Sequence, residues 1–416
     1  MSSLIGRAAL VPLALFAGLG SAAALASPPT QAPKGRTLTL RDVRSLVRKR
    51  APRLLAAQAA IEVARAEVRR ASRLTTRNPQ LLIAAGPRIR GGEAALDVNV
   101  RLIQLVEVFG QRGARIASAE AGVRASRARA AERGRQLVAR ASALFLRALH
   151  TDRALTIAKD DVRLTHDLER VATQRQAAGE VGLLDVYVAQ VARARATARV
   201  GGLLARRALL HGQLRGLLGE NGSLALRGPL VRALRFSLSK LRARSRGRPD
   251  YQLLDAQIMR ARAEARLGRA QRWPNLGVFA RYGREESAHV VLGGIIFTLP
   301  IVARGQGARA RGIARVAAAR QERRAREVQL DAHLAGQLGA YRKLRATLAR
   351  FRTQALGRLV QSLALARKSY QAGHTTLSSL IVLRREIIGA REAHLELKLR
   401  LALAGAALEA AAGGAP

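Results

Sequence analysis

The feature that most constrains the fold is a strand that leads directly into a very long helix, a unit that the chain contains twice. Apolar and polar side chains alternate in residues 96–102, which is the period-2 pattern of a half-buried strand. Gly110 and Gly113 follow, and from residue 114 an Ala- and Arg-rich run continues without proline until Pro229. Because Ala and Arg are good helix formers, this run predicts a helix much longer than those of ordinary globular domains.

The same unit recurs in the second half of the chain. Residues 290–299 are again strand-like, and a second Ala- and Arg-rich run begins after Gly307. Gly307 follows Gly113 by 194 residues, and Gly373 follows Gly179 by the same number (373 − 179 = 194). We interpret the chain as a tandem duplication of one large unit, because this period is too long for the small solenoid repeats.

Each predicted repeat consists of a helix, a β-hairpin and a long antiparallel helical hairpin. In the long helices apolar residues recur at alternating steps of three and four, which is typical of a coiled-coil seam. A short helix is predicted over residues 37–50. The predicted boundaries are a first repeat over 27–218 (β-hairpin 80–108, helical hairpin 114–218), a linker over 219–249, a second repeat over 250–411 (β-hairpin 275–300, helical hairpin 306–411) and a tail over 412–416.

The first 26 residues have the layout of a secretory signal peptide. A single Arg7 precedes an apolar core of about 12 residues, and Ala24-Leu25-Ala26 provides a cleavage site with small residues. We therefore expect the mature chain to begin near Ser27, outside the cytoplasm; a retained N-terminal anchor is the alternative. No later stretch has the roughly 20 uncharged apolar residues of a spanning helix, so strands are the expected means of crossing a membrane.

The chain is strongly basic and contains no cysteine. Its 73 Lys and Arg against 28 Asp and Glu give a formal charge of +45. Such a charge is compatible with a polyanion partner, but arginines spread along the whole chain also fit exposed positions of long helices. Aromatic residues are only 3% of the chain, which leaves few stacking platforms for nucleic acid. We do not expect nucleic acid as the partner.

No catalytic arrangement is evident in the sequence. The seven histidines are scattered, and no pair lies four residues apart on one helix beside a carboxylate, so we predict no metal site. The glycine turn at residues 110–113 lacks the Gly-Lys-Ser/Thr of a phosphate-binding loop, and there is no Gly-x-Ser-x-Gly. We predict no cofactor and no enzymatic activity.

The predicted fold is mainly α with a small β part. Two hairpins supply four strands, which cannot close a barrel alone, and open strand edges are not tolerated in lipid. Three copies would supply twelve strands, within the range of outer-membrane barrels. We therefore predict a trimeric 12-strand β-barrel continued by an α-helical barrel. The alternative is a soluble periplasmic coiled coil with small surface hairpins.

The mature chain resembles the outer-membrane efflux (TolC) family over essentially its whole length. The heavy-metal or cation branch is the nearest match, on the turn at residues 107–112 and on Gln306-Gly307. The matching features are the duplication, Asn78-Pro79 and Pro274-Asn275 before the first strand of each hairpin, the turns at Val108–Arg112, Leu299–Val302 and Arg304–Gly307, the stretch Ala178-Gly179-Glu180 with Leu184-Asp185-Val186 and Ala189-Gln190, and Ala372-Gly373. The N-terminal Cys that anchors many relatives by lipid is absent.

The resemblance implies a homotrimer in the outer membrane whose helices extend into the periplasm. It also implies that the protein is the exit duct of a tripartite pump, docked to a periplasmic adaptor and an inner-membrane transporter. The helical-hairpin tips at Gly179 and Gly373 would then contact the adaptor, and Gly110, Gly113, Gly305 and Gly307 would form the strand-to-helix turns.

Three residues near the hairpin tips are candidates for the pore or gate. Glu180 and Asp185 follow the first tip and His374 follows the second. Carboxylates repeated around a three-fold axis would select ions. For Glu180, capping or solvating a helix start is an equally good interpretation.

Three functions remain open on the sequence. The leading hypothesis is an efflux duct for small molecules or metal ions. A channel of the same fold that exports protein, as in type I secretion, is the second. The third is a basic periplasmic coiled coil that binds polyanions or has a structural role, which predicts steep salt dependence of binding.

Overall fold

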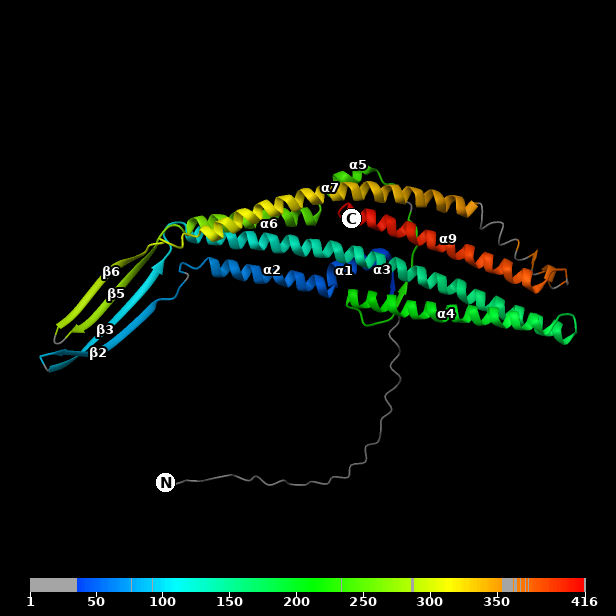
Figure 1. The fold of residues 1–416 in the computed structure, drawn as a ribbon, viewed down its shortest axis with the longest axis horizontal. Coiled ribbons are helices and arrows are strands. Elements are labelled where there is room, and N and C mark those ends of the chain that lie inside the picture. Colours follow the sequence, from blue (N-terminus) through cyan, green and yellow to red (C-terminus); the bar gives the residue numbers. More distant parts are fainter. Residues whose placement is uncertain are drawn as a thin grey trace, which may run out of the picture.

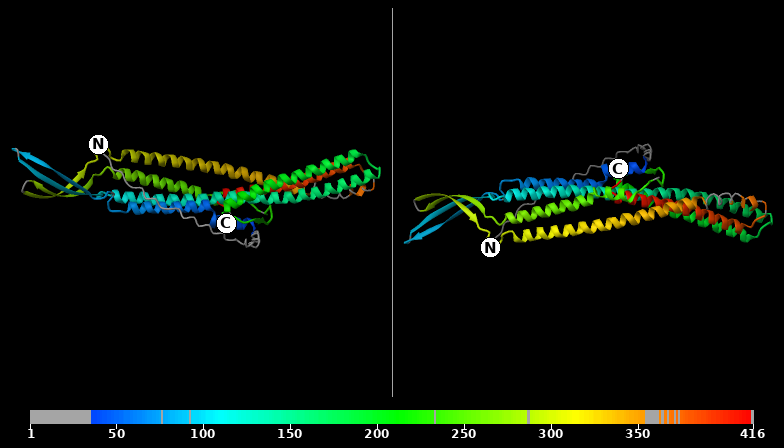
Figure 2. Two further views of the ribbon diagram at one scale, coloured as in Figure 1. Left: turned by 90° about the horizontal axis from the view of Figure 1, so that it is seen from below. Right: turned by 90° about the horizontal axis from the view of Figure 1, so that it is seen from above.

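The computed structural model describes residues 36–414 except 76, 92, 233, 286–287, 354–361, 363–364, 367, 371 and 373. The predicted signal peptide, Ser27 and Gly373 lie outside the described residues. The molecule is elongated and gently bowed: a sheet forms one end, and long helices run from it to the opposite end (Figure 1, Figure 2). The fold is mostly helical with a small β part, as the sequence predicts.

The element bounds follow the repeat pattern. The helices described are α1 (Leu40–Arg50), α2 (Pro52–Ala71), α3 (Gln111–Ala177), α4 (Leu183–Leu218), α5 (Leu238–Ser245), α6 (Pro249–Ala270), α7 (Gln306–Phe351) and α9 (Leu377–Ala411), and the strands are β1 (Arg36–Leu38), β2 (Gln80–Arg90), β3 (Glu93–Val106), β4 (Leu224–Leu226), β5 (Asn275–Glu285) and β6 (Ala288–Thr298). Helix α3 alone has 67 residues, which at 1.5 Å per residue makes it about 100 Å long.

Proline and glycine place the helix ends. Pro52 and Pro249 occupy the first turns of α2 and α6, where their missing N–H costs no hydrogen bond. The backbone of Gly179, just after α3, is left-handed with φ 75°, a conformation that glycine adopts without a Cβ penalty. The starts of α2 and α6 and the end of α3 therefore coincide with proline and glycine residues of the sequence.

The two β-hairpins join into one antiparallel sheet with the strand order β2-β3-β5-β6. Strand β3 of the first repeat pairs with β5 of the second, with Leu102 opposite Ala280. The β2 and β6 strands are the edges of this sheet. The halves of the chain thus meet in the sheet through strands about 180 residues apart.

The expected helix over 37–50 is partly wrong. Residues 36–38 form β1, which pairs in parallel with β4 from the predicted linker, and the helix begins only at Leu40. Thr39 caps it, because its hydroxyl and the Asp42 carboxylate each accept a hydrogen bond from the other's backbone N–H. The 219–249 segment, which lacks helical periodicity, is therefore folded against the first repeat rather than being a bare connection.

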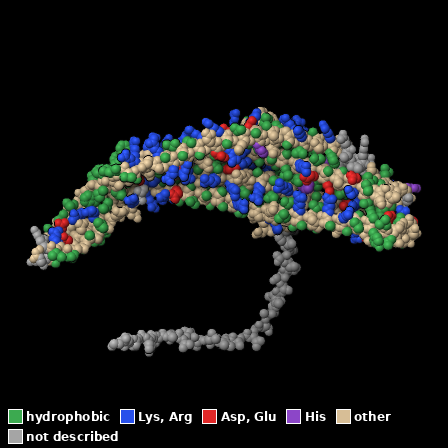
Figure 3. All heavy atoms as spheres, viewed as in Figure 1, with side chains coloured by type: hydrophobic (Ala, Val, Ile, Leu, Met, Phe, Trp, Pro, Cys, Tyr) green, Lys and Arg blue, Asp and Glu red, His purple; other side chains and the backbone are tan. Residues whose placement is uncertain are grey.

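The core is a series of helix contacts along the long axis. In the middle, α1, α3, α4, β4 and α9 share one apolar cluster, so the last helix packs against the first repeat. A second cluster joins α5, α7 and α9, and a third lies at the end away from the sheet. Lys and Arg side chains are spread over the visible face of the helical part rather than gathered in one patch (Figure 3).

None of the helices in the described part of the chain has the length and apolar character needed to cross a membrane.

Candidate functional site: the two-faced sheet and the helical tips

One face of the four-stranded sheet is almost entirely apolar. Because residues directly opposite each other in an antiparallel ladder lie on the same face, the register assigns this face without ambiguity. Its apolar members include Leu81, Ile83, Ala85 and Ile89 of β2, Leu96, Val98, Val100 and Leu102 of β3, Leu276, Val278, Ala280 and Tyr282 of β5, and Val291, Gly293, Ile295 and Phe297 of β6. Gln104, Arg284 and His289 are its polar members.

The opposite face carries the charged side chains of the strands. Arg88 of β2 pairs with Asp97 of β3 at 2.7 Å and with Glu285 of β5 at 3.6 Å. Arg281 pairs with the same Glu285 at 3.0 Å. When the Asn99 amide is oriented with its oxygen toward Arg281, that oxygen accepts two hydrogen bonds from the guanidinium, both at 2.6 Å. These residues form one connected polar network across three strands.

The exposure of the two faces is the reverse of that in a water-soluble protein. On the apolar face Ile89 and Val291 are 75% and 76% exposed, whereas on the polar face the side chains of Asp97 and Arg281 are only 29% and 25% exposed. A sheet in water buries its apolar face and solvates its polar face. This sheet therefore has one face that is mostly apolar, interrupted only by Gln104, Arg284 and His289 among its described residues, and one face that carries the ion-paired charges.

Each strand-to-helix junction is built on a glycine and a glutamine. Gly110 and Gly305 have left-handed backbones, with φ 83° and 71°, immediately before α3 and α7. The Oε1 of Gln111 accepts a hydrogen bond from the N–H of Phe109 at 2.9 Å, and Gln306 does the same for Arg304 at 2.7 Å. The sequence analysis placed Gln111 and Gln306 in the family-like turns but assigned these side chains no role at the junctions.

Gly113 and Gly307 lie in the first turns of α3 and α7, so they do not form the turns themselves as predicted. A Cβ at either position would meet no atom within 4 Å. Gly305, in contrast, is in close contact with α6: a Cβ there would lie 2.1 Å from the carbonyl oxygen of Gly268. The backbone requirement for glycine is therefore confined to the residue before each helix.

The two helical tips lie together at the end of the molecule opposite the sheet (Figure 1). Leu168 and Ala172 of α3 and Val186 and Ala189 of α4 share an apolar cluster with residues 370, 377 and 380 of the second repeat. Arg175 of α3 donates a hydrogen bond to the carbonyl oxygen of Tyr370 at 3.2 Å. The tips therefore pack within one subunit.

The predicted tip residues occupy different positions. Glu180 is exposed, and its carboxylate accepts a hydrogen bond from Arg175 at 2.8 Å. Asp185 lies in the first turn of α4 and is half-buried, and His374 is exposed. Gly179 is exposed and forms the turn after α3. Of the two carboxylates, Glu180 is exposed and paired, whereas Asp185 is half-buried.

Tyr370 is a tip residue that the sequence analysis overlooked. Its side chain is 1% exposed, and the Arg175 guanidinium lies 5.2 Å from its ring centre. Burial raises the pKa of the Tyr370 hydroxyl; Arg175 acts to lower it, and Asp185 acts to raise it. The signal available in the sequence was an aromatic residue about one turn before the tip, in a segment otherwise rich in Ala and Arg.

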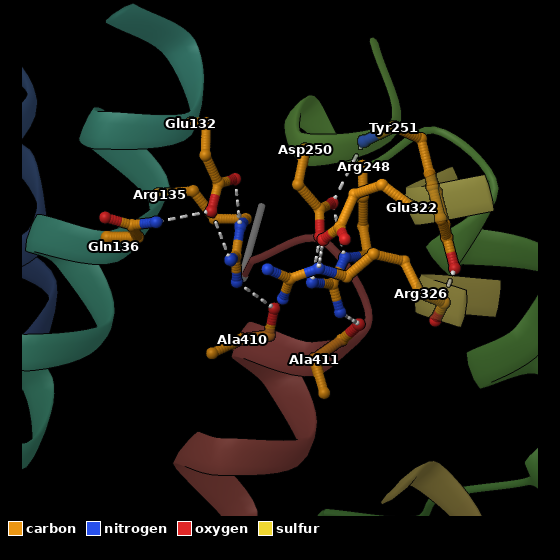
Figure 4. Close-up of polar contacts among 10 residues, drawn as sticks. All are labelled: Glu132, Arg135, Gln136, Arg248, Asp250, Tyr251, Glu322, Arg326, Ala410 and Ala411. Carbon is orange, nitrogen blue, oxygen red and sulfur yellow. Dashed lines mark hydrogen bonds and ion pairs between the residues drawn. The ribbon is translucent and has the colours of Figure 1, made fainter. Parts of the chain in front are cut away.

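A second polar cluster holds the end of the last helix (Figure 4). Arg135 of α3 donates a hydrogen bond to the Ala410 carbonyl oxygen at 3.0 Å, and Arg248 donates one to that of Ala411 at 2.8 Å. Glu132 and Asp250 pair with these arginines. Cations at a helix C-terminus satisfy its free carbonyl groups, so Arg135 of the first repeat and Arg248 at the end of the linker anchor α9 at its end.

A hollow of about 1150 Å³ lies beside α1, the 227–237 segment and α5. Its charged lining is basic apart from Glu409, which Arg44 contacts at 2.5 Å. In the described part of the chain, no group of three or more His, Cys, Asp or Glu side chains is arranged to hold a metal ion.

Residues 241–414 match the family model described as outer membrane efflux protein. No curated protein sequence matches the chain. The solved structures that it resembles have the same fold at low sequence identity. The aligned region covers most of this chain and most of each of those chains.

Three of these structures illustrate the likeness. CusC is 17% identical over 90% of this chain and 92% of its own, with a TM-score of 0.73. A membrane protein from Pseudomonas aeruginosa is 21% identical over 90% of each chain, with a TM-score of 0.73. The outer membrane protein VceC from Vibrio cholerae is 18% identical over 90% of this chain and 96% of its own, with a TM-score of 0.71. These identities do not separate one branch from another, so the heavy-metal branch stays a prediction.

Proposed function

We propose that this chain, whose residues 241–414 form an outer membrane efflux protein domain, is one subunit of a trimeric outer-membrane channel. The observation that carries the proposal is the difference between the two faces of the sheet: the mostly apolar, exposed face would lie outward and the face with the ion-paired charges inward. Lipid is the solvent that such an outward face requires, and water in a lumen is the solvent that the inner face requires.

The edges of the sheet support a closed assembly of several copies. Strands β2 and β6 each have one neighbour, so each has a row of backbone groups without a ladder partner in the subunit. Hydrocarbon cannot satisfy such groups. Pairing β6 of one subunit with β2 of the next, three times over, closes a 12-strand barrel. The long helices of the three subunits would continue it as an α-helical barrel in the periplasm.

The proposed role is the passive exit duct of a tripartite efflux pump. The signal-like N-terminus directs the chain out of the cytoplasm, and a periplasmic adaptor would dock at the tips near Gly179 and Gly373, with an inner-membrane transporter beyond it. The transporter would select the cargo, a metal ion or a small molecule. Export of protein through the same fold is the alternative, and the identity of the transporter partner distinguishes the two.

The assembly can be tested by native mass measurement of the detergent-extracted protein, followed by recording in planar bilayers. We expect a trimer that forms ion-conducting channels. A monomer in the soluble fraction that binds polyanions with steep salt dependence would instead favour the basic coiled coil, with the hollow beside α1 as the binding surface.

We further propose that Asp185 contributes to the gate. It follows the first tip, and its charge acts on Tyr370, a buried residue of the second repeat. Replacing Asp185 with Ala should change single-channel conductance or cation preference and leave the trimer intact. The exposed Glu180 and His374 serve as comparison positions, since Glu180 is already paired with Arg175. Identical conductance and selectivity in wild type and Asp185→Ala would remove Asp185 from the gate.

A further inference from the structure

The polar face of the sheet contains Arg101, which has no counter-ion among the side chains that the structure describes. Arg101 of β3 lies directly opposite Arg281 of β5, and the same row continues to Leu82 and Leu292 on the outer strands. Like charges directly opposite each other destabilise a sheet, because their side chains lie close together. This row therefore places two guanidinium groups between two apolar side chains, an arrangement that folding alone does not favour.

The carboxylates of this face whose side chains the structure describes are already paired with other arginines. Asp97 pairs with Arg88, and Glu285 is shared between Arg88 and Arg281. Among the described residues, Arg101 has no carboxylate partner. Its guanidinium lies 5.9 Å from the ring centre of Phe279, and its buried Nε has no hydrogen-bond partner. Arg101 is thus an uncompensated and incompletely satisfied cation.

We infer that the row of Arg101 and Arg281 forms an anion-binding ring in the lumen, so that the channel favours small anions over cations. The inference rests on the proposed function, since three subunits would repeat both arginines around one axis. Rings of arginine in a pore favour anions, and a guanidinium with free donors binds carboxylate, phosphate or chloride. The ring lies among the middle residues of β3, away from the helical tips.

The test is the reversal potential of single channels in a potassium chloride gradient. We expect wild-type channels to favour chloride over potassium. Arg101→Gln removes one charge per subunit from the ring, and it should lower the chloride-to-potassium permeability ratio by about twofold or more at 0.1 M salt, where the screening length is about 10 Å. Arg101→Glu should lower it further, and Arg101→Lys, which keeps the charge, should retain a preference for chloride.

Arg284→Gln is the matched control. Arg284 is exposed and lies on β5 like Arg281, but in the row of Val98 and His289 on the opposite face. Its replacement should leave the permeability ratio unchanged. Native mass measurement shows whether each variant still forms a trimer. If a variant does not assemble, the sign of the wild-type reversal potential alone decides whether the channel favours chloride or potassium.

Two failures are distinguishable. If the wild-type protein forms no trimer and no channel, the proposed function is wrong. If channels form but favour potassium, or if Arg101→Gln and wild type have the same permeability ratio, the anion ring is wrong while the proposed channel stands.

Discussion

Replacing Arg248 with Ala should destabilise the fold more than the loss of any exposed ion pair. Arg248 is 8% exposed and connects the start of α6 to the end of α9. It donates to both carboxylate oxygens of Asp250, at 2.8 and 2.6 Å, and to the Ala411 carbonyl oxygen at 2.8 Å. Alanine would leave the Asp250 carboxylate and the last turn of α9 without this partner.

The magnitude follows from what remains after the substitution. Removing one partner of a buried pair costs about 3–5 kcal/mol, because the other charge is left unpaired. The Asp250 side chain is only 15% exposed, so the cost for a buried pair applies to it. Since Arg135 also acts on Asp250 and holds the neighbouring carbonyl group, we expect a loss near the lower end, about 3 kcal/mol in the free energy of unfolding.

The pKa of Asp250 provides an independent measure. Burial acts to raise this pKa, but the hydrogen bonds and charge of Arg248, the charge of Arg135 and the backbone N–H of Tyr251 together outweigh burial, and the pKa lies below its ordinary value. Arg248→Ala should therefore raise the pKa of Asp250. A folded-state pKa below the unfolded value contributes stability at neutral pH that is lost as the pH falls through the folded value. In the variant this contribution should be absent.

The assay is denaturant unfolding of equal concentrations of each protein in detergent, followed by circular dichroism. Arg242→Ala is the control, since Arg242 forms an equally close pair with Asp331 while both side chains are half exposed, and its loss should change stability little. Arg248→Ala with Asp250→Asn should recover part of the loss, because no charge is then stranded. If Arg248→Ala is no more destabilised than Arg242→Ala, the buried clamp on α9 is not a source of stability.

Three further predictions concern other parts of the chain. Gly305→Ala should prevent normal packing of α7 on α6, because the new Cβ would overlap the Gly268 carbonyl group. Gly307→Ala, which meets no neighbouring atom, should be neutral or should stabilise the fold by about 0.5–1 kcal/mol. Trimer yield and melting temperature measure both effects. Burial lowers the pKa values of His150 and His394, so the folded state binds fewer protons than the unfolded state. The free energy of unfolding should therefore decrease as the pH falls below about 6.5, and it should decrease less steeply in the His150→Gln and His394→Gln variants. Melting temperature measured against pH checks this. Mass spectrometry of the mature protein should give an N-terminus near Ser27, and an intact N-terminus would contradict the predicted cleavage.

The sequence by itself determined the kinds of element and their duplication. Period-2 alternation, long Ala- and Arg-rich runs and the 194-residue spacing are local or repetitive signals, and they predict a mainly α fold with two β-hairpins. The resemblance to the outer-membrane efflux family agrees with the family match over residues 241–414 and with the fold over 90% of the chain. The predicted gate residues and the trimer stay predictions.

Only the tertiary structure decided which distant residues meet. Nothing local to Arg101 indicates that it lies opposite Arg281, because the pairing of β3 with β5 joins segments from different repeats. The β1–β4 pair and the packing of Tyr370 against the α3–α4 tip are likewise contacts between distant segments. Periodicity assigns a side chain to a face of its own strand or helix, whereas register and packing depend on the free energy of the whole chain. That Arg101 has no carboxylate partner among the described residues could therefore be found only in three dimensions.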